Sequence, residues 1–394
     1  MNFKIPFSNR SHAYTKEEID AVIQSMNDAI PLTQGKYLKE FEKKFCEYLN
    51  VNHSFGVNNA TSALELAAQL CQFKNDEEVI IPLHTYTSSA YPFIKKGAKV
   101  VWCDIELETR VVSAKKIEEK ITSKTKAIVV VHLYGYCANM PEIIDLAKKY
   151  NLLVIEDVAQ AMGTSINEKK AGAFGDFGVF SFHSHKNMTT LGEGGMLTVK
   201  DNEIANLVPL LRHNGHCSFN FDRNDFWVPA MGNLDLPNLN GIDMMPNNYC
   251  IGEVESALGI KLLDRIDDMN NKKRERAIKF IDSLSDYDEL TFHKVENNRH
   301  NYHLLVAQMK DGLRDKFIRH MANEMGIQCA VQYYPLNRYD LYKKIGLSKA
   351  DCPNVDKFFD NMVSLPFHHM LTDIEIDQVI KACKDTLNSI RNSV

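Results

Sequence analysis

A single lysine, Lys186, stands between a short apolar run and a glycine cluster in the stretch "SFHSHKNMTTLGEGGMLTV", which covers residues 181–199. A lysine amine held away from water can act as a nucleophile and form a Schiff base with a carbonyl group. A solvated charge on a surface turn would have the same local sequence. The stretch alone leaves both interpretations open, and the rest of the chain has to decide between them.

Two acids lie together in "VIEDVAQAMG", residues 154–163, where Glu156 and Asp157 follow the most apolar run of the chain. In open α/β sheets, ligands collect at the carboxyl ends of the strands. An acid buried there needs a partner, and the protonated ring nitrogen of a pyridine cofactor is one candidate. A helix cap or an ion pair with a neighbouring helix is the alternative.

The stretch "NNATSALELAA", residues 58–68, joins an apolar run to a helix. Small residues at 60–63 leave the first N–H groups of that helix open to an anion such as a phosphate. Ser62 and Glu65 have the spacing of a capping box, so a well-capped helix explains the stretch equally well. Ser181, five residues before Lys186, is placed to contribute a hydroxyl to a bound phosphate.

The histidines His183 and His185, two residues apart, precede Lys186. A metal site would need further ligands at suitable spacing, and we find none in the sequence. We therefore expect these histidines to line a pocket, and we expect no metal.

Short apolar runs alternate with helix-length patterns through the first half of the chain. The runs cover residues 78–83, 99–105, 127–135, 152–159, 178–183 and 195–200. Nearly continuous Val and Ile runs separated by helices predict an α/β fold with a mostly parallel sheet covered on both faces. In such a fold Asp157 and Lys186 both follow strands, so the two candidate functions support each other.

The later part of the chain changes character at about Asn248, where the pattern predicts one long helical stretch. A smaller α+β unit follows, closed by a helix over 373–391 for which Thr372 is the expected cap. We expect a large α/β domain over 1–247, a helical connector over 248–285 and a small domain over 286–394. The segment 213–247 is rich in Asn, Asp, Gly and Pro, and its length predicts a functional loop.

The composition excludes several classes of protein. The 394 residues are 44% hydrophobic and 25% charged, with a formal net charge of -5. This slightly acidic balance lacks the excess of basic residues that is typical of nucleic-acid-binding proteins. "KKRER" at 272–276 is the densest basic patch, and its acidic neighbours favour a solvated helix face. Nine cysteines without a CxxC pair indicate a reducing compartment. Without an 18-residue apolar run or an apolar leader, we expect a cytoplasmic protein with no membrane contact.

Along the chain, the candidate phosphate site at residues 60–63 (the phosphate seat) is followed by the strand-end acid Asp157 and then by Lys186. A chain with this order of features resembles the fold-type I pyridoxal-phosphate (PLP) enzymes, and specifically the DegT/DnrJ/EryC1/StrS sugar aminotransferases. The resemblance covers nearly the whole chain. It is carried by "GKYLKEFEKKFCEYL", "NNATSALELAAQL", "IPLHTYTSSA", "VVVHLYGYCANMPEI", "VIEDVAQAMG", "SFHSHKNMTTLGEGGM", "NNYCIGEVESALGIKLL" and "SLPFHHMLTDIEIDQVI".

The resemblance implies a role for each matching position. Lys186 would form the Schiff base with pyridoxal 5′-phosphate and move the proton, while Asp157 would pair with the pyridine nitrogen. Gln160 would neighbour the O3′ oxygen, Tyr86 would stack on the ring, and His183 would line the pocket. The expected phosphate contacts are Ala60, Thr61, Ser62, Ser181 and, across the interface of an obligatory homodimer, Asn248.

Three departures from the family pattern stand out. The arginine usual two positions after Asn248 is Cys250, and the glycine expected before Thr61 is Ala60. Gln332 and Asn337 occupy positions where the family often has histidines. The positions of Cys250, Gln332 and Asn337 are expected to affect substrate or dimer contacts rather than the cofactor.

The resemblance implies transfer of an amino group from L-glutamate to a keto-sugar. The subgroup that looks closest forms 8-amino-3,8-dideoxy-manno-octulosonate, a lipopolysaccharide sugar. Cys250 and the scarcity of basic residues in 213–247 fit an acceptor without a diphosphate. The alternatives are a nucleotide-linked keto-deoxysugar acceptor, a dehydratase of the same fold, in which a histidine would replace Lys186, and a non-catalytic sensor.

Overall fold

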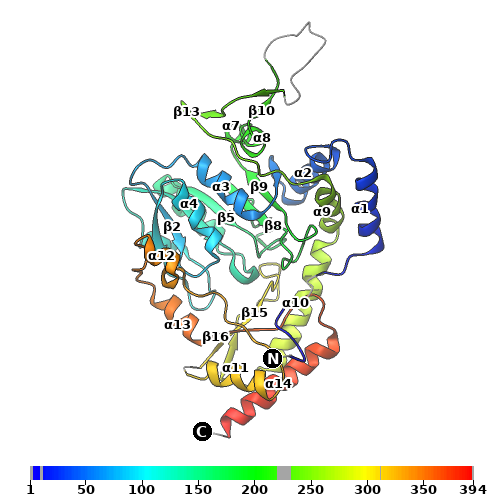
Figure 1. The fold of residues 1–394 in the computed structure, drawn as a ribbon. Helices are drawn as coiled ribbons and strands as arrows, with labels where there is room; N and C mark the ends of the chain where they lie inside the picture. The colour runs from blue at the N-terminus through cyan, green and yellow to red at the C-terminus, as the bar shows by residue number, and fades with distance from the viewer. Residues whose placement is uncertain (1–2, 9–11, 220–231, 311, 393–394) are drawn as a thin grey trace.

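The computed structural model describes residues 3–8, 12–219, 232–310 and 312–392. Within them, the largest sheet has seven strands in the order β1-β9-β8-β5-β4-β2-β3 (Figure 1). These strands are β1 (Ser54–Val57), β2 (Glu78–Pro82), β3 (Lys99–Cys103), β4 (Thr125–Val131), β5 (Leu153–Asp157), β8 (Phe177–Ser181) and β9 (Gly195–Val199).

The direction of the strands makes the sheet mostly parallel, as the apolar runs predict. Strand β9 pairs antiparallel with both β8 and β1, and the remaining pairs are parallel. The chain therefore leaves β1, β2, β4, β5 and β8 at the same edge of the sheet. Ligand sites of open α/β sheets form at that edge.

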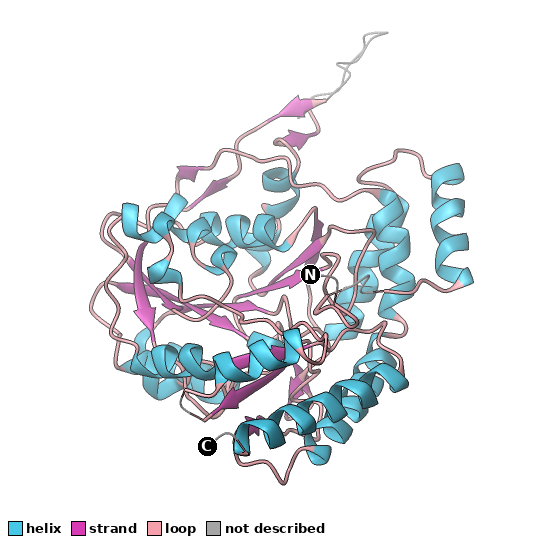
Figure 2. Cartoon of the chain, turned by 60° about the horizontal axis from the view of Figure 1, so that its bottom comes forward, coloured by secondary structure: helices cyan, strands magenta, loops and turns pink. Residues whose placement is uncertain are grey.

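Helices flank the central strands, and Figure 2 shows them above and below the sheet. Helix α3 (Ala60–Leu70) packs against β8 and β9, α4 (Tyr91–Lys95) against β3, and α6 (Met140–Tyr150) against β5. Helices α1 (Lys16–Asp28) and α2 (Lys36–Leu49) pack against α9 (Glu253–Leu263). The shorter helices are α5 (Ala114–Glu118), α7 (Asn202–Ala205), α8 (Val208–Arg212), α12 (Asp340–Lys344) and α13 (Pro353–Asn361), with 3-10 turns η1 (Thr87–Ser89), η2 (Leu133–Gly135) and η3 (Leu336–Arg338).

The cap of α3 differs from the expected capping box. The helix begins at Ala60, and the Asn59 side chain accepts a hydrogen bond from the N–H of Ser62 at 2.9 Å. Ser62 therefore lies inside the first turn, and the Ser62–Glu65 capping box is wrong. Glu65 instead accepts from Lys95 and from the Tyr249 hydroxyl.

The connector is two helices rather than one long stretch. Helix α9 ends at Leu263, and α10 (Ile266–Ser283) begins after Asp264 and Arg265. Arg265 turns toward the N-terminal segment, where its guanidinium donates to Glu18 at 3.0 Å. This break lets α9 pack on α1 and α2 while α10 continues toward α14.

The C-terminal part has its own three-stranded sheet of β14 (Leu290–Phe292), β15 (Leu305–Met309) and β16 (Met362–Leu365). Helices α11 (Arg314–Asn323) and α14 (Asp373–Arg391) pack together beside it, and Thr372 caps α14 as expected, in a capping box with Glu375. A second hydrophobic core gathers these elements, the end of α10 and Ile5. The domain boundaries at 247 and 285 stay a prediction.

The segment 213–247 carries two short antiparallel pairs that project from the body (Figure 1). They are β10 (His216–Cys217) with β11 (Asn233–Leu234), and β12 (Asn238–Leu239) with β13 (Ile242–Asp243). Another pair, β6 (Ser165–Ile166) with β7 (Lys169–Lys170), follows β5. Residues 220–231, at the centre of the expected functional loop, lie outside the described residues.

All nine cysteines are free thiols. A search of the described helices finds none with the length and apolar character needed to span a bilayer.

The loop after β7 is fixed to the sheet by Glu156, a fully buried acid. Its carboxylate accepts hydrogen bonds from the backbone N–H groups of Phe174 and Gly175, both at 2.7 Å, and of Gly172 at 2.9 Å. His132 donates the fourth through Nε2 at 3.1 Å, since its Nδ1 accepts from the Ala138 N–H. Glu156 therefore has a structural role in holding this loop, and it is neither the helix cap nor the helix ion pair that the sequence suggested as the alternative.

We predict that Glu156→Gln destabilises the chain by about 3 kcal/mol, because an amide group cannot accept all of these charge-assisted hydrogen bonds. The measurement is the midpoint of urea denaturation. Glu168→Gln, on an exposed turn nearby, is the matched control and should leave the midpoint unchanged. Equal midpoints for the two variants would contradict the assigned role.

Candidate active site

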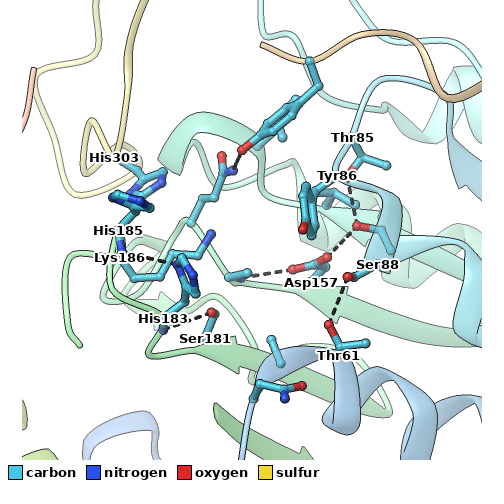
Figure 3. A pocket seen from close by; sticks show the side chains of 18 of the residues that line it. Thr61, Thr85, Tyr86, Ser88, Asp157, Ser181, His183, His185, Lys186 and His303 are labelled. Atoms are coloured by element: carbon cyan, nitrogen blue, oxygen red, sulfur yellow. Dashed lines mark hydrogen bonds between the residues drawn. The ribbon is translucent and has the colours of Figure 1, made fainter. Parts of the chain in front are cut away.

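A cavity of about 860 Å³ opens where the carboxyl ends of β5 and β8 meet the start of α3 (Figure 3). Its wall combines parts of the chain that are far apart in sequence. The part of the chain around the large sheet contributes residues from 59–95, 131–193 and Tyr249, and the N-terminal segment contributes Phe7 and Ser8. Helix α10 and the C-terminal part contribute residues from 273, 303–304, 332–333 and 367–369. The cavity therefore depends on contact between the two parts of the chain.

Lys186 lies in the loop between β8 and β9 and lines this cavity. The loop returns through Gly192 and Gly194, whose φ values of +117° and +151° favour glycine. Burial lowers the pKa of Lys186 to about 8, and the negative charge of Asp157 partly opposes this shift. A substantial share of the amine is then neutral near physiological pH, as a nucleophile requires.

Asp157 is the last residue of β5 and lines the cavity. Its Oδ2 accepts from the Ser89 hydroxyl at 2.7 Å, and its Oδ1 accepts from the Ala159 N–H at 3.1 Å. These two donors hold the carboxylate in one orientation. The Glu156 carboxylate is already occupied by hydrogen bonds from the loop after β7. Asp157 is therefore the acid of the pair that is available to a ligand.

The start of α3 provides donors suited to a phosphate. The N–H groups of Ala60 and Thr61 have no acceptor among the described residues, and the Thr61 hydroxyl lies 2.9 Å from that of Ser88. Ser62 and Ser181 also line the cavity. Gly195 lets β9 approach, because a Cβ there would lie 2.6 Å from the Asn59 carbonyl carbon. A helix N-terminus with several hydroxyls is a typical phosphate site.

Gln160 and Tyr86 also lie in the wall, as expected. The Gln160 side-chain Oε1 accepts from the Tyr134 N–H, and its Nε2 donates to the Tyr333 hydroxyl, both at 2.7 Å. The Tyr86 ring is 56% exposed and stands 6.0 Å from the Tyr333 ring. Figure 3 shows the Tyr86 ring beside Asp157, where a flat cofactor ring would meet it.

His183 and His185 line the cavity, and burial lowers the pKa of His183. Among the described residues, no group of three or more His, Cys, Asp or Glu side chains has metal-site geometry.

Of the positions where the chain departs from the family pattern, Gln332 lies in the wall, with its Oε1 buried and unpartnered among the described residues. Asn337 instead donates to the Ser348 carbonyl at 3.1 Å and does not line the cavity. Asn248 is exposed beside His213 and does not line the cavity of its own chain. Its role across a dimer interface stays a prediction.

Several wall residues were missed by the sequence analysis. Ser88, Ser89, His303 and Tyr333 follow no pattern that marks them as functional. Lys273 lies in "KKRER", and its assignment to a solvated face is wrong because the side chain lines the cavity. The buried residues Met269 and Ala277 stand four residues away on either side, so helical periodicity places Lys273 on the inner face of α10.

Comparison with known proteins agrees with this geometry. The DegT/DnrJ/EryC1/StrS aminotransferase family matches residues 13–384. GDP-perosamine synthase of Caulobacter vibrioides is 33% identical over 380 residues, covering 94% of this chain and 95% of the relative. UDP-4-amino-4,6-dideoxy-N-acetyl-beta-L-altrosamine transaminase of Campylobacter jejuni is 32% identical over 387 residues, covering 96% of each.

The fold has also been solved with its cofactor. The Streptococcus pneumoniae protein Spr1654, in its PLP form, superposes with a TM-score of 0.82 at 26% identity, covering 97% of this chain and 99% of that one. The fold and the site define a PLP-dependent aminotransferase of fold-type I. This chain belongs to the DegT/DnrJ/EryC1/StrS aminotransferase family and is a sugar aminotransferase.

We predict that attachment of pyridoxal phosphate to the cofactor-free chain rises with pH to a midpoint near 8, the pKa of Lys186. An exposed lysine, with a pKa of about 10.4, would give a much later rise. Asp157→Asn should move the midpoint to lower pH, because the negative charge that favours the ammonium form is lost. Absorbance of the bound cofactor provides the measurement, and an upward shift in this variant would contradict the assigned electrostatics.

Proposed function

We propose that this enzyme transfers an amino group from L-glutamate to the keto carbon of a nucleotide-linked deoxysugar. The observation that carries the proposal is the Lys186 amine and the Asp157 carboxylate facing one cavity beside a phosphate seat. The relatives named above, a GDP-perosamine synthase and a UDP-sugar transaminase, support a nucleotide-linked acceptor.

The octulosonate acceptor favoured in the sequence analysis has no support from these relatives. Part of that argument depended on Cys250. In the structure Cys250 does not line the cavity, and its thiol donates to the Arg212 carbonyl at 3.5 Å. The identity of this residue therefore says nothing about a diphosphate in the cavity of the same chain.

The residues present fit pyridoxal phosphate. The start of α3, with Thr61 and Ser62, and the Ser181 hydroxyl would hold its phosphate. Asp157 would keep a proton on the pyridine nitrogen, and Ser89 and the Ala159 N–H keep that carboxylate aimed at it.

The cofactor supplies a ring that withdraws electrons from the carbon carrying the amino group. Lys186 removes the proton from the donor Cα and returns a proton when the sugar carbon is aminated. Its lowered pKa makes both steps accessible near neutral pH. Gln160, positioned by Tyr134 and Tyr333, orients the ring edge. The same residues serve both half-reactions, because the second reverses the steps of the first.

We expect the purified enzyme to turn over glutamate with at least one nucleotide-linked keto-deoxysugar from a panel that also contains the 8-keto octulosonate. Formation of the amino sugar and of 2-oxoglutarate is measured by mass spectrometry. Lys186→Ala should abolish turnover, since no other lysine of the cavity faces Asp157 in the described residues.

The panel separates the candidate functions. Amination of the octulosonate alone would overturn the proposed acceptor. Turnover by Lys186→Ala near the wild-type rate would overturn the role of the lysine.

We also propose a homodimer with shared sites, in which Asn248 reaches the phosphate bound by the other subunit. Its exposure on the single chain supports this. Mixing Asn248→Ala chains with Lys186→Ala chains should restore part of the activity, because one site of each mixed dimer would have both residues intact. Mixed dimers that form but stay inactive would show that Asn248 serves its own subunit.

A further inference from the structure

Lys273 extends from α10 into the wall of the cavity. Its ammonium group donates to the Asn187 Oδ1 at 3.2 Å and to the His303 carbonyl at 2.8 Å. Asn187 follows Lys186 directly in the chain, and its Oδ1 also lies 3.2 Å from the His303 Nδ1. Hydrogen bonds thus link Lys273 to the residue beside the reacting lysine.

The charge of Lys273 is not balanced by a nearby acid. Its described partners are a neutral amide and a carbonyl, and burial lowers its pKa to about 7 with no carboxylate opposing the shift. The other two lysines of the wall differ, because Lys95 is paired with Glu65 and Lys186 interacts with Asp157. No arginine lines the described cavity. A buried cation without a counter-charge is costly, and a bound anion would remove that cost.

The surroundings of Lys273 add polar groups without charge. His368 lines the same wall, and neither of its ring nitrogens has a partner among the described residues. Burial lowers the pKa of His368 and of His303, and the positive charge of Lys273 adds to both shifts. The negative charge of Glu375 partly opposes the pKa shift for His368. The Phe367 ring stands 5.7 Å from the Lys273 ammonium. An unpartnered imidazole beside an uncompensated ammonium forms a pocket for an anion.

This pocket is separate from the phosphate seat. Figure 3 shows His303 and His185 at one end of the cavity and Thr61 and Ser88 at the other, with Lys186 beside the histidines. Since Lys273 contacts His303 and Asn187, it lies at the histidine end. An anion there would be close to the carbon whose proton Lys186 moves.

We propose that Lys273 binds the α-carboxylate of the amino donor, with His368 as a second contact. The inference rests on the proposed function, because it assigns the donor's place in that site. The α-carboxylate is bonded to the reacting carbon and so must lie close to Lys186. The diphosphate of a nucleotide sugar is separated from its keto carbon by the sugar ring, which places it farther away. The side-chain carboxylate of glutamate is likewise two carbons more distant.

The test compares Lys273→Gln and Lys273→Arg with Lys272→Gln as the matched control. The Gln variant keeps an N–H donor but loses the charge, the Arg variant keeps the charge, and Lys272 is exposed and outside the wall. The ligands are 2-methylglutamate and 2-methylalanine, amino acids without a Cα proton, so that binding occurs without turnover. Absorbance of the bound cofactor reports their dissociation constants.

We expect Lys273→Gln to weaken both ligands by the same factor, about tenfold or more for a lost charge-assisted hydrogen bond. Lys273→Arg should recover most of the affinity, and Lys272→Gln should bind as the wild type does. The rate of the half-reaction with the keto-sugar should fall much less than that with glutamate.

Three results would overturn the inference. Weakening of 2-methylglutamate alone would assign Lys273 to the side-chain carboxylate, and equal loss of donor and keto-sugar half-reactions would indicate a purely structural role. Unchanged affinity for both ligands would remove Lys273 from the donor site. The titration needs no acceptor, so it can succeed even where the proposed sugar acceptor fails.

Discussion

Glu156 and Asp157 are neighbours at the end of β5, and successive side chains of a strand point to opposite faces. Glu156 is directed into the protein, where the loop at 172–175 and His132 saturate it. Asp157 is directed into the cavity, where Ser89 and one backbone N–H leave it able to take a ligand. The alternation of one strand thus separates a structural acid from a functional acid.

The electrostatics of the cavity follow from this arrangement. Of the three lysines that line the described cavity, Lys186 and Lys273 are desolvated, and desolvation favours the neutral form of both amines. Asp157 moderates the shift for Lys186, whereas no acid does so for Lys273. Lys186 is thereby suited to exchange protons. Lys273 is suited to hold its proton, and hence its positive charge, when an anion binds beside it. Two residues of the same type differ in chemistry because of a single carboxylate.

Much of the fold could be predicted from local pattern. Continuous apolar runs mark β2, β4, β5 and β8. The strand-end positions of Asp157 and Ser181, and the place of Lys186 in the loop after β8, follow from these runs. The features that the sequence analysis predicted wrongly are the cap of one helix and the continuity of another. The α3 cap is Asn59 rather than Ser62, because both residue types cap helices and the sequence does not reveal where the first turn begins. At the break between α9 and α10, Arg265 donates to Glu18, a residue distant in the sequence, so local pattern could not indicate this contact.

The sequence by itself determined the chemistry that is local to one segment: an amine at Lys186, an acid after a buried strand and a helix start with open N–H groups. Resemblance to a family gave these groups a common cofactor. Only the tertiary structure showed that Glu156 holds the loop at 172–175 and that Lys273 lines the cavity. The reason is physical. Burial and the distance between charges set the pKa and the availability of each group, and both depend on contacts between segments that the sequence holds far apart.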